Sequence, residues 1–513
     1  MALLNSFLSW WMKKRIHQLE LFLKYPQDVQ GEVFHKLIQQ AQNTEYGKKY
    51  SYSDIKNPKQ FKERVPVMNY DTFKPWIQRV MQGEQNIIWN TEIKWFAKSS
   101  GTTSDKSKFI PVSREAIEDC HFKGAKDLLS IYCNNNPDTK IFDGKSLTLG
   151  GSHQINSIPK GMDTHSNESF SGDISAILIQ NLPNWVDIIR TPDNSIALME
   201  DWEAKIEKMA TVTAFEDVTN ISGVPTWTLV LAKRILEITG KKNLTEVWHN
   251  LELFIHGAVS FVPYRDQFQR LIPSGNMRYL ETYNASEGFF GIQDRSDLSE
   301  LLLMLDYGIY YEFMPMEEYG KEHPRTVGLD EVVTEKNYAL VISTNGGLWR
   351  YLIGDTVKFT CLSPFRIKIT GRTKHYINAF GEEVIVDNAE NALQIACEKT
   401  NSLVRDYTVA PVYISENANG AHEWLIEFER PPVSLQFFSE VLDNALKSLN
   451  SDYEAKRYND LALRKPIINI LPENTFFNWL KAKGKLGGQH KVPRLSNDRK
   501  IAEEILGMEK ARV

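Results

Sequence analysis

The sequence Leu251-Glu-Leu-Phe-Ile-His-Gly257 begins a stretch whose apolar pattern predicts a strand, a helix and a second strand. Residues 251–257 form the first strand and its turn, residues 261–271 have the spacing of an amphipathic helix, and residues 277–283 form the next strand. This β-α-β pattern indicates an α/β fold. The second strand leads into Asn284-Ala-Ser-Glu-Gly288, so these polar residues are expected beyond the carboxyl end of a strand, where open α/β sheets bind ligands.

Further regular segments lie on both sides of this unit. Residues 19–82 predict a helical region, and Pro225 is placed to begin another helix. Strands are expected at 338–344, 356–361 and 365–370, and the glycines of segment 345–355 would permit turns between the first two.

The last part of the chain predicts a small α+β domain. Its expected elements are a helix at 387–399, a hairpin of strands 407–415 and 424–429, a helix at 434–449 and a strand at 466–471. We therefore expect a large N-terminal domain at 1–372 and a small C-terminal domain at 373–513.

Length and composition limit the classes of protein that need to be considered. A chain of 513 residues exceeds what one hydrophobic core usually organises, and 42% hydrophobic with 24% charged residues is typical of a soluble globular protein. The net charge of -5 argues against broad attraction to nucleic acid or anionic membranes. We expect a small-molecule partner and no nucleic acid.

The cysteines and the amino terminus bear on localisation. The four cysteines are widely spaced and form no CxxC pair, which fits a reducing, cytoplasmic environment. The apolar residues 3–11 precede Lys13 and Arg15, which reverses the order of a signal peptide, and they are too few to span a bilayer. We expect no integral membrane association and predict a helix packed in the core, with a peripheral membrane contact as the alternative.

The segment from Lys98 to Lys108 has the composition of a phosphate-binding loop. It combines Gly101, which allows close backbone approach, with a run of hydroxyl donors and several lysines. It is not a Walker A sequence, which requires GxxxxGK[ST], and an ordinary solvated turn has a similar composition. A short strand at 108–112 follows, and Ser113 is a candidate N-cap for a helix through Tyr132.

Several motifs in fixed order resemble the nucleotide-binding motifs of the adenylate-forming superfamily of acyl-CoA synthetases and firefly luciferases. They are Ser99-Ser-Gly-Thr-Thr103 with Lys108, Tyr283-Asn-Ala-Ser-Glu287, Tyr351-Leu-Ile-Gly-Asp355 and Gly371-Arg372. A narrower set resembles the Gretchen Hagen auxin-responsive family of acyl acid amido synthetases, which join hormone carboxylic acids to amino acids. That set is His256-Gly-Ala, Tyr283 to Ile292, Tyr311-Glu-Phe-Met-Pro, Gly347-Leu-Trp-Arg-Tyr and Gly488-Gln-His-Lys-Val-Pro-Arg494.

The resemblance implies a fold and a set of roles. The implied fold is a large N-terminal adenylate-forming domain of α/β sheets with a β-barrel-like part, followed by a small mobile α+β C-terminal domain. It implies that Glu287 holds Mg²⁺ and that Lys491 reaches the α-phosphate and the carboxylate oxygen, as the catalytic residues. The implied nucleotide-binding residues are Ser99, Ser100, Gly101, Thr102, Thr103 and Lys108 around the phosphates, Tyr283 beside adenine, the adjoining Asn284, Ala285 and Ser286, Asp355 on the ribose hydroxyls and Arg372 on ribose or phosphate.

Each of these residues also has a structural interpretation. Glu287 could cap a helix, Tyr283 could be a core tyrosine, and Asp355 could belong to a turn. A flexible basic tail such as the one around Lys491 is usually only solvated. Arg350 is a candidate to orient its loop by pairing with a carboxylate.

The sequence also departs from the family at two places. Plant members carry a lysine near Glu382-Glu383, so a charge is reversed there, with Lys374 as a candidate replacement. The segment Gly150-Gly-Ser-His153 falls where the family places part of its amino-acid site, although His153 also fits a structural histidine. The sequence contains no HxH, HExxH or cysteine cluster that would indicate zinc.

The resemblance implies a monomeric ligase that uses ATP and Mg²⁺ to adenylate a small carboxylic acid and transfer the acyl group to an amino acid. The alternative enzyme transfers the same adenylate to coenzyme A or another thiol. A third interpretation is a carboxylate- or nucleotide-binding protein that has lost turnover.

Overall fold

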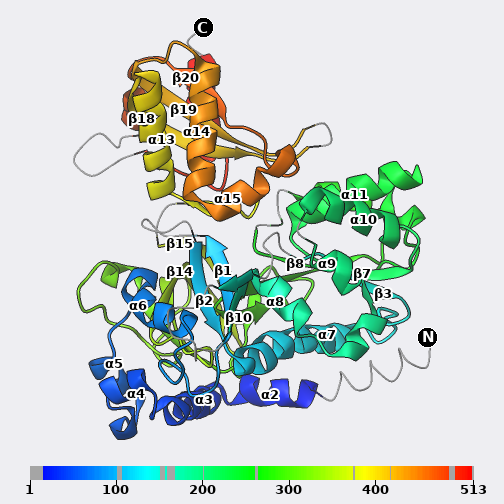
Figure 1. Cartoon of the computed structure of the whole chain (residues 1–513), viewed down its shortest axis with the longest axis vertical. Coiled ribbons are helices and arrows are strands. Elements are labelled where there is room, and N and C mark those ends of the chain that lie inside the picture. Colours follow the sequence, from blue (N-terminus) through cyan, green and yellow to red (C-terminus); the bar gives the residue numbers. More distant parts are fainter. Residues whose placement is uncertain are drawn as a thin grey trace. The chain divides into compact units, whose positions relative to one another are not determined.

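The computed structural model forms two compact units (Figure 1). It describes residues 15–100, 107–150, 156–158, 168–199, 201–259, 261, 264–373, 376–415, 418–483 and 492–510. Unit 1 comprises Met1–Ser99, Phe109–Ala258 and Phe268–Thr373, and unit 2 comprises Ser100–Lys108, Val259–Gln267 and Lys374–Val513. The predicted helix at residues 3–11 lies outside the described residues.

The main sheet of unit 1 has 11 strands and combines a parallel half with an antiparallel half. The parallel half, in spatial order, is β6 (Arg190–Thr191), β3 (Lys145–Thr148), β7 (Val218–Ser222), β8 (Leu253–Gly257) and β9 (Arg278–Ala285). The antiparallel half continues with β10 (Gly288–Ile292), β11 (Leu301–Leu303), β15 (Phe365–Arg372), β14 (Tyr351–Leu362), β13 (Asn337–Thr344) and β12 (Ile309–Pro315). The predicted β-α-β unit is confirmed, since β8 and β9 are parallel neighbours separated by helix α12 (Arg265–Leu271).

A second sheet in the order β2-β1-β5-β4 carries the start of the candidate phosphate loop. Its strands are β1 (Trp95–Ser100), β2 (Ser107–Val112), β4 (Asn156–Ile158) and β5 (Ser169–Gly172). Strands β1 and β5 are parallel, with Ala97 paired to Gly172. Their carboxyl ends therefore lie at the same edge of the sheet.

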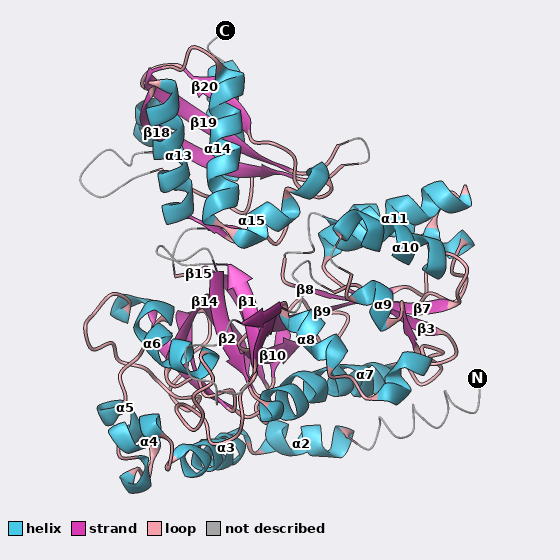
Figure 2. Cartoon of the chain, viewed as in Figure 1, coloured by secondary structure: helices cyan, strands magenta, loops and turns pink. Residues whose placement is uncertain are grey.

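Helices cover these sheets (Figure 2). The amino-terminal helices are α2 (Ile16–Lys24), α3 (Pro26–Ala41), α4 (Glu45–Lys49), η1 (Tyr52–Asp54), α5 (Pro58–Arg64) and α6 (Tyr70–Met81). The later ones are η2 (Ala116–Phe122), α7 (Lys123–Asn135), α8 (Ile174–Gln180), η3 (Asn184–Ile188), α9 (Asn194–Ala197), α10 (Trp202–Thr213), α11 (Pro225–Thr239), η4 (Leu244–Glu246) and η6 (Met316–Glu318). The helical region predicted at 19–82 is thus confirmed, and Pro225 begins α11 as expected.

The helix after β2 begins where the sequence predicts it. The Ser113 hydroxyl accepts the backbone N–H of Ala116 at 3.0 Å and donates to the carbonyl of Asn345 at 2.6 Å. The first turns form the π-helix η2, and the chain then continues as α7 to Asn135. An added Cβ at Gly124 would come within 2.6 Å of the Phe289 ring, so this helix packs tightly on β10.

Unit 2 contains a three-stranded sheet covered by helices. The strands are β18 (Leu403–Val412), β19 (Ala421–Arg430) and β20 (Ile467–Leu471), in that order, and a small hairpin is formed by β16 (Tyr376–Ile377) and β17 (Val384–Ile385). Helices α13 (Val386–Thr400) and α14 (Leu435–Leu449) lie side by side on one face of the sheet (Figure 1). The remaining helices are α15 (Ser451–Lys456), η7 (Tyr458–Asp460), α16 (Thr475–Ala482) and α17 (Lys500–Lys510).

A separate apolar cluster supports the unit 2 sheet. Phe476 and Trp479 of α16 and Ile505 of α17 pack with Leu425 of β19 and Leu471 of β20. The α/β fold with a large N-terminal part and a smaller α+β C-terminal part is therefore confirmed.

One predicted boundary is wrong, because the strand expected to begin at Thr356 begins at Tyr351. Asp355 therefore lies inside β14 and not in a turn. Gly354 takes a φ of +100°, and the pairing of β14 with β15 shifts between Thr356 and Val357. Glycine and aspartate are depleted in strands, so the sequence pattern does not indicate that the first residues of β14 belong to a strand.

Arg350 connects the amino-terminal helical region to the antiparallel half of the main sheet. Its Nε and Nη2 donate to the Glu312 carboxylate at 3.0 Å, and Nη2 also donates to the Thr326 hydroxyl at 2.8 Å. Its Nη1 donates to the carbonyls of Lys62 at 3.0 Å and Val65 at 2.6 Å. The expectation that Arg350 pairs with a carboxylate is confirmed.

Replacing Glu312 with Gln should destabilise unit 1 strongly. The side chains of Arg350 and Glu312 are 4% and 1% exposed, so the change leaves a buried guanidinium without its counter-charge. The loss of one partner of a buried pair typically lowers the free energy of unfolding by about 3–5 kcal/mol. Urea denaturation measures the effect. The control is Glu317→Gln, which removes an exposed pair with Lys336 and should leave the midpoint nearly unchanged. Equal midpoints for the two variants would refute a stabilising role for the Arg350–Glu312 pair.

Candidate functional site

Three predicted nucleotide-binding residues meet on strands β9, β14 and β15 of the main sheet. The Tyr283 hydroxyl donates to Asp355 Oδ2 at 2.7 Å, and the Arg372 Nε donates to Asp355 Oδ1 at 2.9 Å. Asp355 on β14 is the direct cross-strand partner of Arg372 on β15, and Tyr283 reaches it from β9. The carboxylate is therefore held from both sides in one orientation.

Burial determines the chemistry of this trio. Tyr283 is buried, and burial together with the Asp355 carboxylate raises its pKa well above the usual value, so its hydroxyl remains a donor. The side chains of Asp355 and Arg372 are 12% and 20% exposed, so the pair is partly accessible to solvent. Each carboxylate oxygen has a second lone pair, so Asp355 can accept two further hydrogen bonds.

Glu287 lies close to this trio in the two-residue turn between β9 and β10. Its negative charge contributes to the raised pKa of both Tyr283 and Tyr351, for which burial is the largest cause, while Arg372 acts in the opposite direction. Asn284 and Ala285 end β9, and Ser286 shares the turn with Glu287. The predicted position at the carboxyl end of a strand is confirmed.

Glu287 supplies a carboxylate, which is a type of ligand that Mg²⁺ takes. Within the described ranges, His, Cys, Asp and Glu side chains do not gather in groups of three or more that could ligate a metal. Glu287 is half-buried, and the charges of Glu287 and Arg372 act in opposite directions on the pKa of Tyr283. Mg²⁺ commonly takes one or two carboxylates and completes its shell with phosphate oxygens and water, which a single carboxylate in a turn can serve.

The candidate phosphate loop is described only at its edges. Ser99 and Ser100 end β1, and Lys108 belongs to β2. Gly101, Thr102 and Thr103 lie outside the described residues. The roles predicted for the loop stay predictions.

Lys491 also lies outside the described residues, and so does His153. The residues that follow Lys491 are anchored within unit 2. Val492 is buried, the Arg494 carbonyl accepts the backbone N–H of Val409 at 2.9 Å, and the Arg494 guanidinium pairs with Asp406. The segment that bears Lys491 therefore ends at a fixed point beside β18.

Glu382 is one of the two glutamates at the position where plant members carry a lysine, and its contacts are structural. Its carboxylate accepts the backbone N–H groups of Ala379 at 3.1 Å and Phe380 at 2.6 Å and contacts His422 Nε2 at 2.8 Å. The side chains of Glu382 and His422 are 0% and 1% exposed. Glu382 therefore stabilises the turn between β16 and β17 from inside unit 2.

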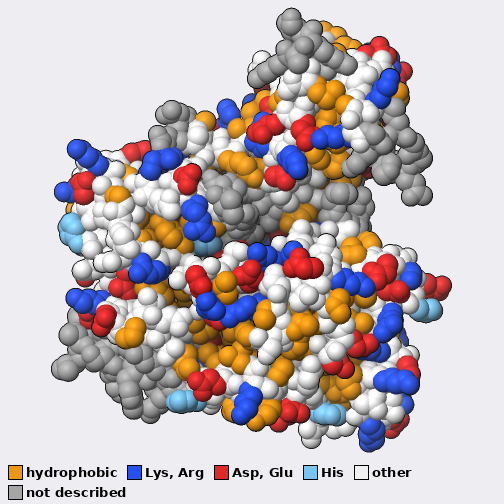
Figure 3. Space-filling model, turned by 180° about the vertical axis from the view of Figure 1, so that it is seen from behind, with side chains coloured by type: hydrophobic (Ala, Val, Ile, Leu, Met, Phe, Trp, Pro, Cys, Tyr) orange, Lys and Arg blue, Asp and Glu red, His pale blue; other side chains and the backbone are white. Residues whose placement is uncertain are grey.

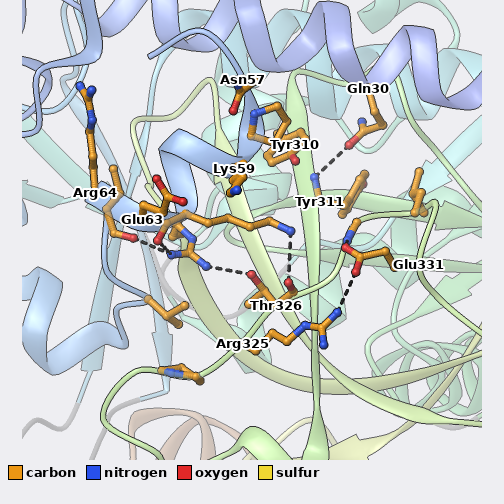
Figure 4. Close-up of a pocket in the computed structure, with 18 of the residues that line it drawn as sticks. Gln30, Asn57, Lys59, Glu63, Arg64, Tyr310, Tyr311, Arg325, Thr326 and Glu331 are labelled. Atoms are coloured by element: carbon orange, nitrogen blue, oxygen red, sulfur yellow. Dashed lines mark hydrogen bonds and ion pairs between the residues drawn. The ribbon is translucent and has the colours of Figure 1, made fainter. Parts of the chain in front are cut away.

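A cavity of about 1180 Å³ in unit 1 is lined by none of the predicted site residues (Figure 4). Its wall includes the Gln30 side chain, which hydrogen-bonds the backbone N–H of Tyr311 at 2.9 Å, and the ion pair between Arg325 and Glu331 at 2.9 Å. Arg350 also borders this cavity, but its donors are already engaged in the contacts that link helix α5 to the sheet. The cavity is distinct from the Tyr283–Asp355–Arg372 cluster.

Three further observations concern the surface, the helices and the cysteines. On the face drawn in Figure 3, Lys and Arg side chains are interspersed with Asp and Glu side chains. None of the helices in the described part of the chain combines the length and apolar character needed to cross a bilayer. All four cysteines are free thiols.

Sequence reasoning missed the contacts that organise the site. It did not predict that Tyr283 and Arg372 both bind Asp355. The roles of Tyr283 beside adenine and of Arg372 on ribose or phosphate stay predictions. The antiparallel pairing of two expected strands, 356–361 and 365–370, is the signal that could have brought Asp355 and Arg372 together. No local pattern indicates the long-range contact of Tyr283.

Solved structures of acyl-activating enzymes share this fold. The GH3.15 acyl acid amido synthetase in complex with 2,4-DB aligns with a TM-score of 0.62 at 17% identity, over 97% of this chain and 96% of that chain. The 2-hydroxyisobutyryl-CoA ligase in complex with 2-HIB-AMP and CoA aligns with a TM-score of 0.57 at 12% identity, over 96% and 93% of the two chains. The fold is thus that of the adenylate-forming enzymes.

Family models identify the chain more narrowly. The GH3 family N-terminal domain matches residues 15–277, the central domain matches 302–372 and the C-terminal domain matches 387–500. The chain belongs to the GH3 family. Its relatives include the indole-3-acetic acid-amido synthetase GH3.3 of Arabidopsis thaliana, 23% identical over 91% of this chain and 89% of that protein. The jasmonoyl-L-amino acid synthetase JAR6 of Nicotiana attenuata is 24% identical over 94% of this chain and 93% of that protein.

Replacing Tyr283 with Phe should weaken the binding of ATP, because Asp355 loses the donor that fixes one of its oxygens. A hydrogen bond to a charged group contributes about 1.5–3 kcal/mol, so the Kd for ATP should rise by roughly tenfold or more. Isothermal titration calorimetry measures it. Tyr338→Phe is the control, since it removes another buried hydroxyl, which accepts the backbone N–H of Val333. A Kd that is unchanged in Tyr283→Phe, or raised equally by both substitutions, argues against a role for the Tyr283–Asp355 hydrogen bond in ATP binding.

Proposed function

We propose that this chain is an ATP- and Mg²⁺-dependent acyl acid amido synthetase that joins a small carboxylic acid to an amino acid. The observation that carries the proposal is the Asp355 carboxylate, fixed by Tyr283 and Arg372 and close to Glu287. This arrangement belongs to a GH3 family chain whose relatives are named as amido synthetases of indole-3-acetic acid and jasmonic acid. Together these findings favour adenylation followed by amide formation.

In the first half-reaction, a carboxylate oxygen of the acid attacks the α-phosphorus of ATP. A new oxygen–phosphorus bond forms, the bond between the α-phosphorus and the bridging oxygen breaks, and pyrophosphate leaves with the electron pair. The attack brings two anions together, at a cost of about 4 kcal/mol for each charge pair at 4 Å and an effective dielectric of 20. Positive charge near the α-phosphate must offset this repulsion.

In the second half-reaction, the unprotonated amine of the amino acid attacks the carbonyl carbon of the acyl adenylate. The carbon–nitrogen bond forms, the bond to the AMP oxygen breaks, and AMP leaves with the electron pair while the nitrogen releases a proton to solvent. No covalent intermediate with the enzyme is required. Catalysis then consists mainly of positioning and charge neutralisation.

The residues take the following roles in this proposal. Asp355 accepts the ribose hydroxyls, Arg372 supports Asp355 and faces the nucleotide, and Ser99 with the loop through Thr103 and Lys108 surrounds the β- and γ-phosphates. Glu287 would hold Mg²⁺, which supplies positive charge to the phosphate oxygens when bound. Asn284, Ala285 and Ser286 complete the nucleotide-binding strand end.

We propose the division of labour between domains as well. Residues 1–372 form the large ATP- and acyl-binding domain, and residues 373–513 form the small domain that carries Lys491 toward the α-phosphate. Lys491 lies in the sequence between the glycine-rich residues 484–488 and Arg494, which pairs with Asp406. We further propose that the enzyme acts as a monomer in the cytoplasm.

An assay with different acceptors tests this function against the alternative, in which the acyl group is transferred to a thiol. Coenzyme A is the thiol to test, because the 2-hydroxyisobutyryl-CoA ligase shares this fold. Aryl and alkyl carboxylic acids are first screened by acid-dependent exchange of labelled pyrophosphate into ATP. Steady pyrophosphate release is then measured with each amino acid and with coenzyme A. Stimulation by amino acids supports the proposal, stimulation by coenzyme A alone supports a thioester-forming ligase, and the absence of exchange with every acid refutes both.

The Glu287→Gln variant should require a higher Mg²⁺ concentration for pyrophosphate exchange. The amide is a weaker ligand for a hard cation than the carboxylate, so the half-saturating concentration should rise by roughly tenfold or more. The control is Glu281→Gln on the preceding strand β9, which removes another half-buried carboxylate. Identical metal titrations for Glu287→Gln and wild type would remove Glu287 from the metal site.

The Lys491→Ala variant should slow adenylation while ATP affinity changes little. In the proposal this cation acts mainly when the charges of the acid and the α-phosphate come together, so kcat should fall by roughly a hundredfold or more. Single-turnover pyrophosphate release and calorimetry with ATP separate the two quantities. Lys481→Ala, an exposed lysine of α16, should leave both unchanged. Equal losses of affinity and rate in Lys491→Ala would contradict the role.

A further inference from the structure

Strand β20 forms an edge of the unit 2 sheet. Its residues 467–471 pair in parallel with β19, and within the described part of the chain its other side pairs with no strand. The opposite edge of the sheet is partly covered, because Val409 of β18 forms a bridge with Leu495. A sheet edge presents backbone N–H and C=O groups that can pair with a further strand, so the β20 edge is a candidate interaction surface.

The side chains along this edge are apolar and partly exposed. Residues 467–471 are Ile-Ile-Asn-Ile-Leu, with no charge and no proline among them. Ile470 is aligned with Ile426 of β19, on the face of the sheet that α14 covers, yet it is 50% exposed. Ile468 lies on the same face and is half-buried. Edge strands commonly carry a charge or a bulge that prevents pairing, and β20 carries neither between its ends.

The sequence of this edge is symmetric about Asn469. Pro466 and Pro472 flank the strand, and beyond them stand Lys465 at its start and Glu473 at its end. When a second β20 runs antiparallel to the first with Asn469 facing its own copy, Lys465 of each chain faces Glu473 of the other. The isoleucines between the charged ends then face one another as well. The register that covers the apolar side chains is therefore also the register that pairs opposite charges.

We propose that two copies of this chain associate through β20, which pairs antiparallel with β20 of the second copy about a two-fold axis at Asn469. Ile468 of each copy then lies opposite Ile470 of the other, and the two sheets continue into one. Such an interface is self-complementary and closed, so association ends at a dimer.

Cross-strand contacts and burial of apolar surface favour this pairing. Pairs of β-branched residues and of opposite charges facing each other across two strands both stabilise a sheet. Within one chain Lys465 contacts Glu440 at 3.3 Å, and Glu473 contacts Arg405 at 2.6 Å. All four side chains are at least 40% exposed, and ion pairs at exposed positions contribute little. Lys465 and Glu473 can therefore exchange these partners for a second chain at small cost.

The pairing goes beyond the proposed function and leaves the catalytic unit unchanged. Every residue proposed for the nucleotide site belongs to a single chain, so each monomer keeps its own site within the dimer. The rate of pyrophosphate exchange per chain should therefore be equal above and below the concentration at which dimers form.

Sedimentation velocity of the full chain over a range of concentrations measures the association. Wild type should form a species of twice the chain mass of 59.0 kDa. Ile470→Asp should raise the Kd of the dimer by roughly a hundredfold or more, because each copy would bury a charge opposite an isoleucine. The matched control is Leu403→Asp, which changes an exposed apolar residue of the other edge strand, β18, and should leave the Kd unchanged.

Exchange of the end charges tests the antiparallel register without altering apolar residues. Lys465→Glu and Glu473→Lys should each weaken the dimer, because each brings like charges face to face, and the double variant should restore it. The contacts with Glu440 and Arg405 within one chain cannot produce this rescue, since both are lost in the double variant.

Three results would overturn the inference. They are a wild-type chain that keeps the mass of one copy at every concentration, equal dimerisation of Ile470→Asp and Leu403→Asp, and a double charge variant that dimerises no more tightly than either single variant. Wild-type enzyme without pyrophosphate exchange would overturn the proposed function and leave this inference intact.

Discussion

The orientation of one carboxylate is the constraint on which the proposed site depends. Asp355 is held by the Tyr283 hydroxyl at 2.7 Å and the Arg372 guanidinium at 2.9 Å, and these three side chains come from three strands of one sheet. The strand register therefore determines the geometry of the site. A carboxylate with both oxygens already oriented can meet two hydroxyls of a ligand without further loss of conformational freedom.

The remaining buried charges keep that sheet and its surroundings in place. Arg350 ties Glu312 on β12 to the carbonyls of Lys62 and Val65, and Gln30 hydrogen-bonds both the carbonyl of Ile309 and the backbone N–H of Tyr311. These contacts connect the amino-terminal helices to the antiparallel strands. The buried charges of unit 1 thus serve two purposes. The donors of Arg350 are all engaged in structural contacts, whereas the Asp355 carboxylate is partly exposed and can accept further hydrogen bonds.

Much of the fold could be predicted because it follows from local patterns. The apolar segments around 251–257 and 277–283 gave two parallel strands, and the motif at Tyr283 to Glu287 lay at the strand end, as expected. The start of β14 was missed because Gly354 and Asp355 are poor strand formers, and the sheet pairing overrides that preference. Contacts such as those of Glu312 with Arg350 and of Glu382 with His422 join residues 38 and 40 positions apart, and no local pattern specifies them.

The most direct measurement compares the binding of ATP and of 2′,3′-dideoxy-ATP to the wild-type enzyme and to Asp355→Asn, by calorimetry. If Asp355 accepts the ribose hydroxyls, wild type should bind ATP roughly tenfold or more tightly than the dideoxy analogue. Asp355→Asn should lose most of that difference. Equal affinity of the wild-type enzyme for the two nucleotides would contradict the account, because the oriented carboxylate would then have no ligand hydroxyl to bind.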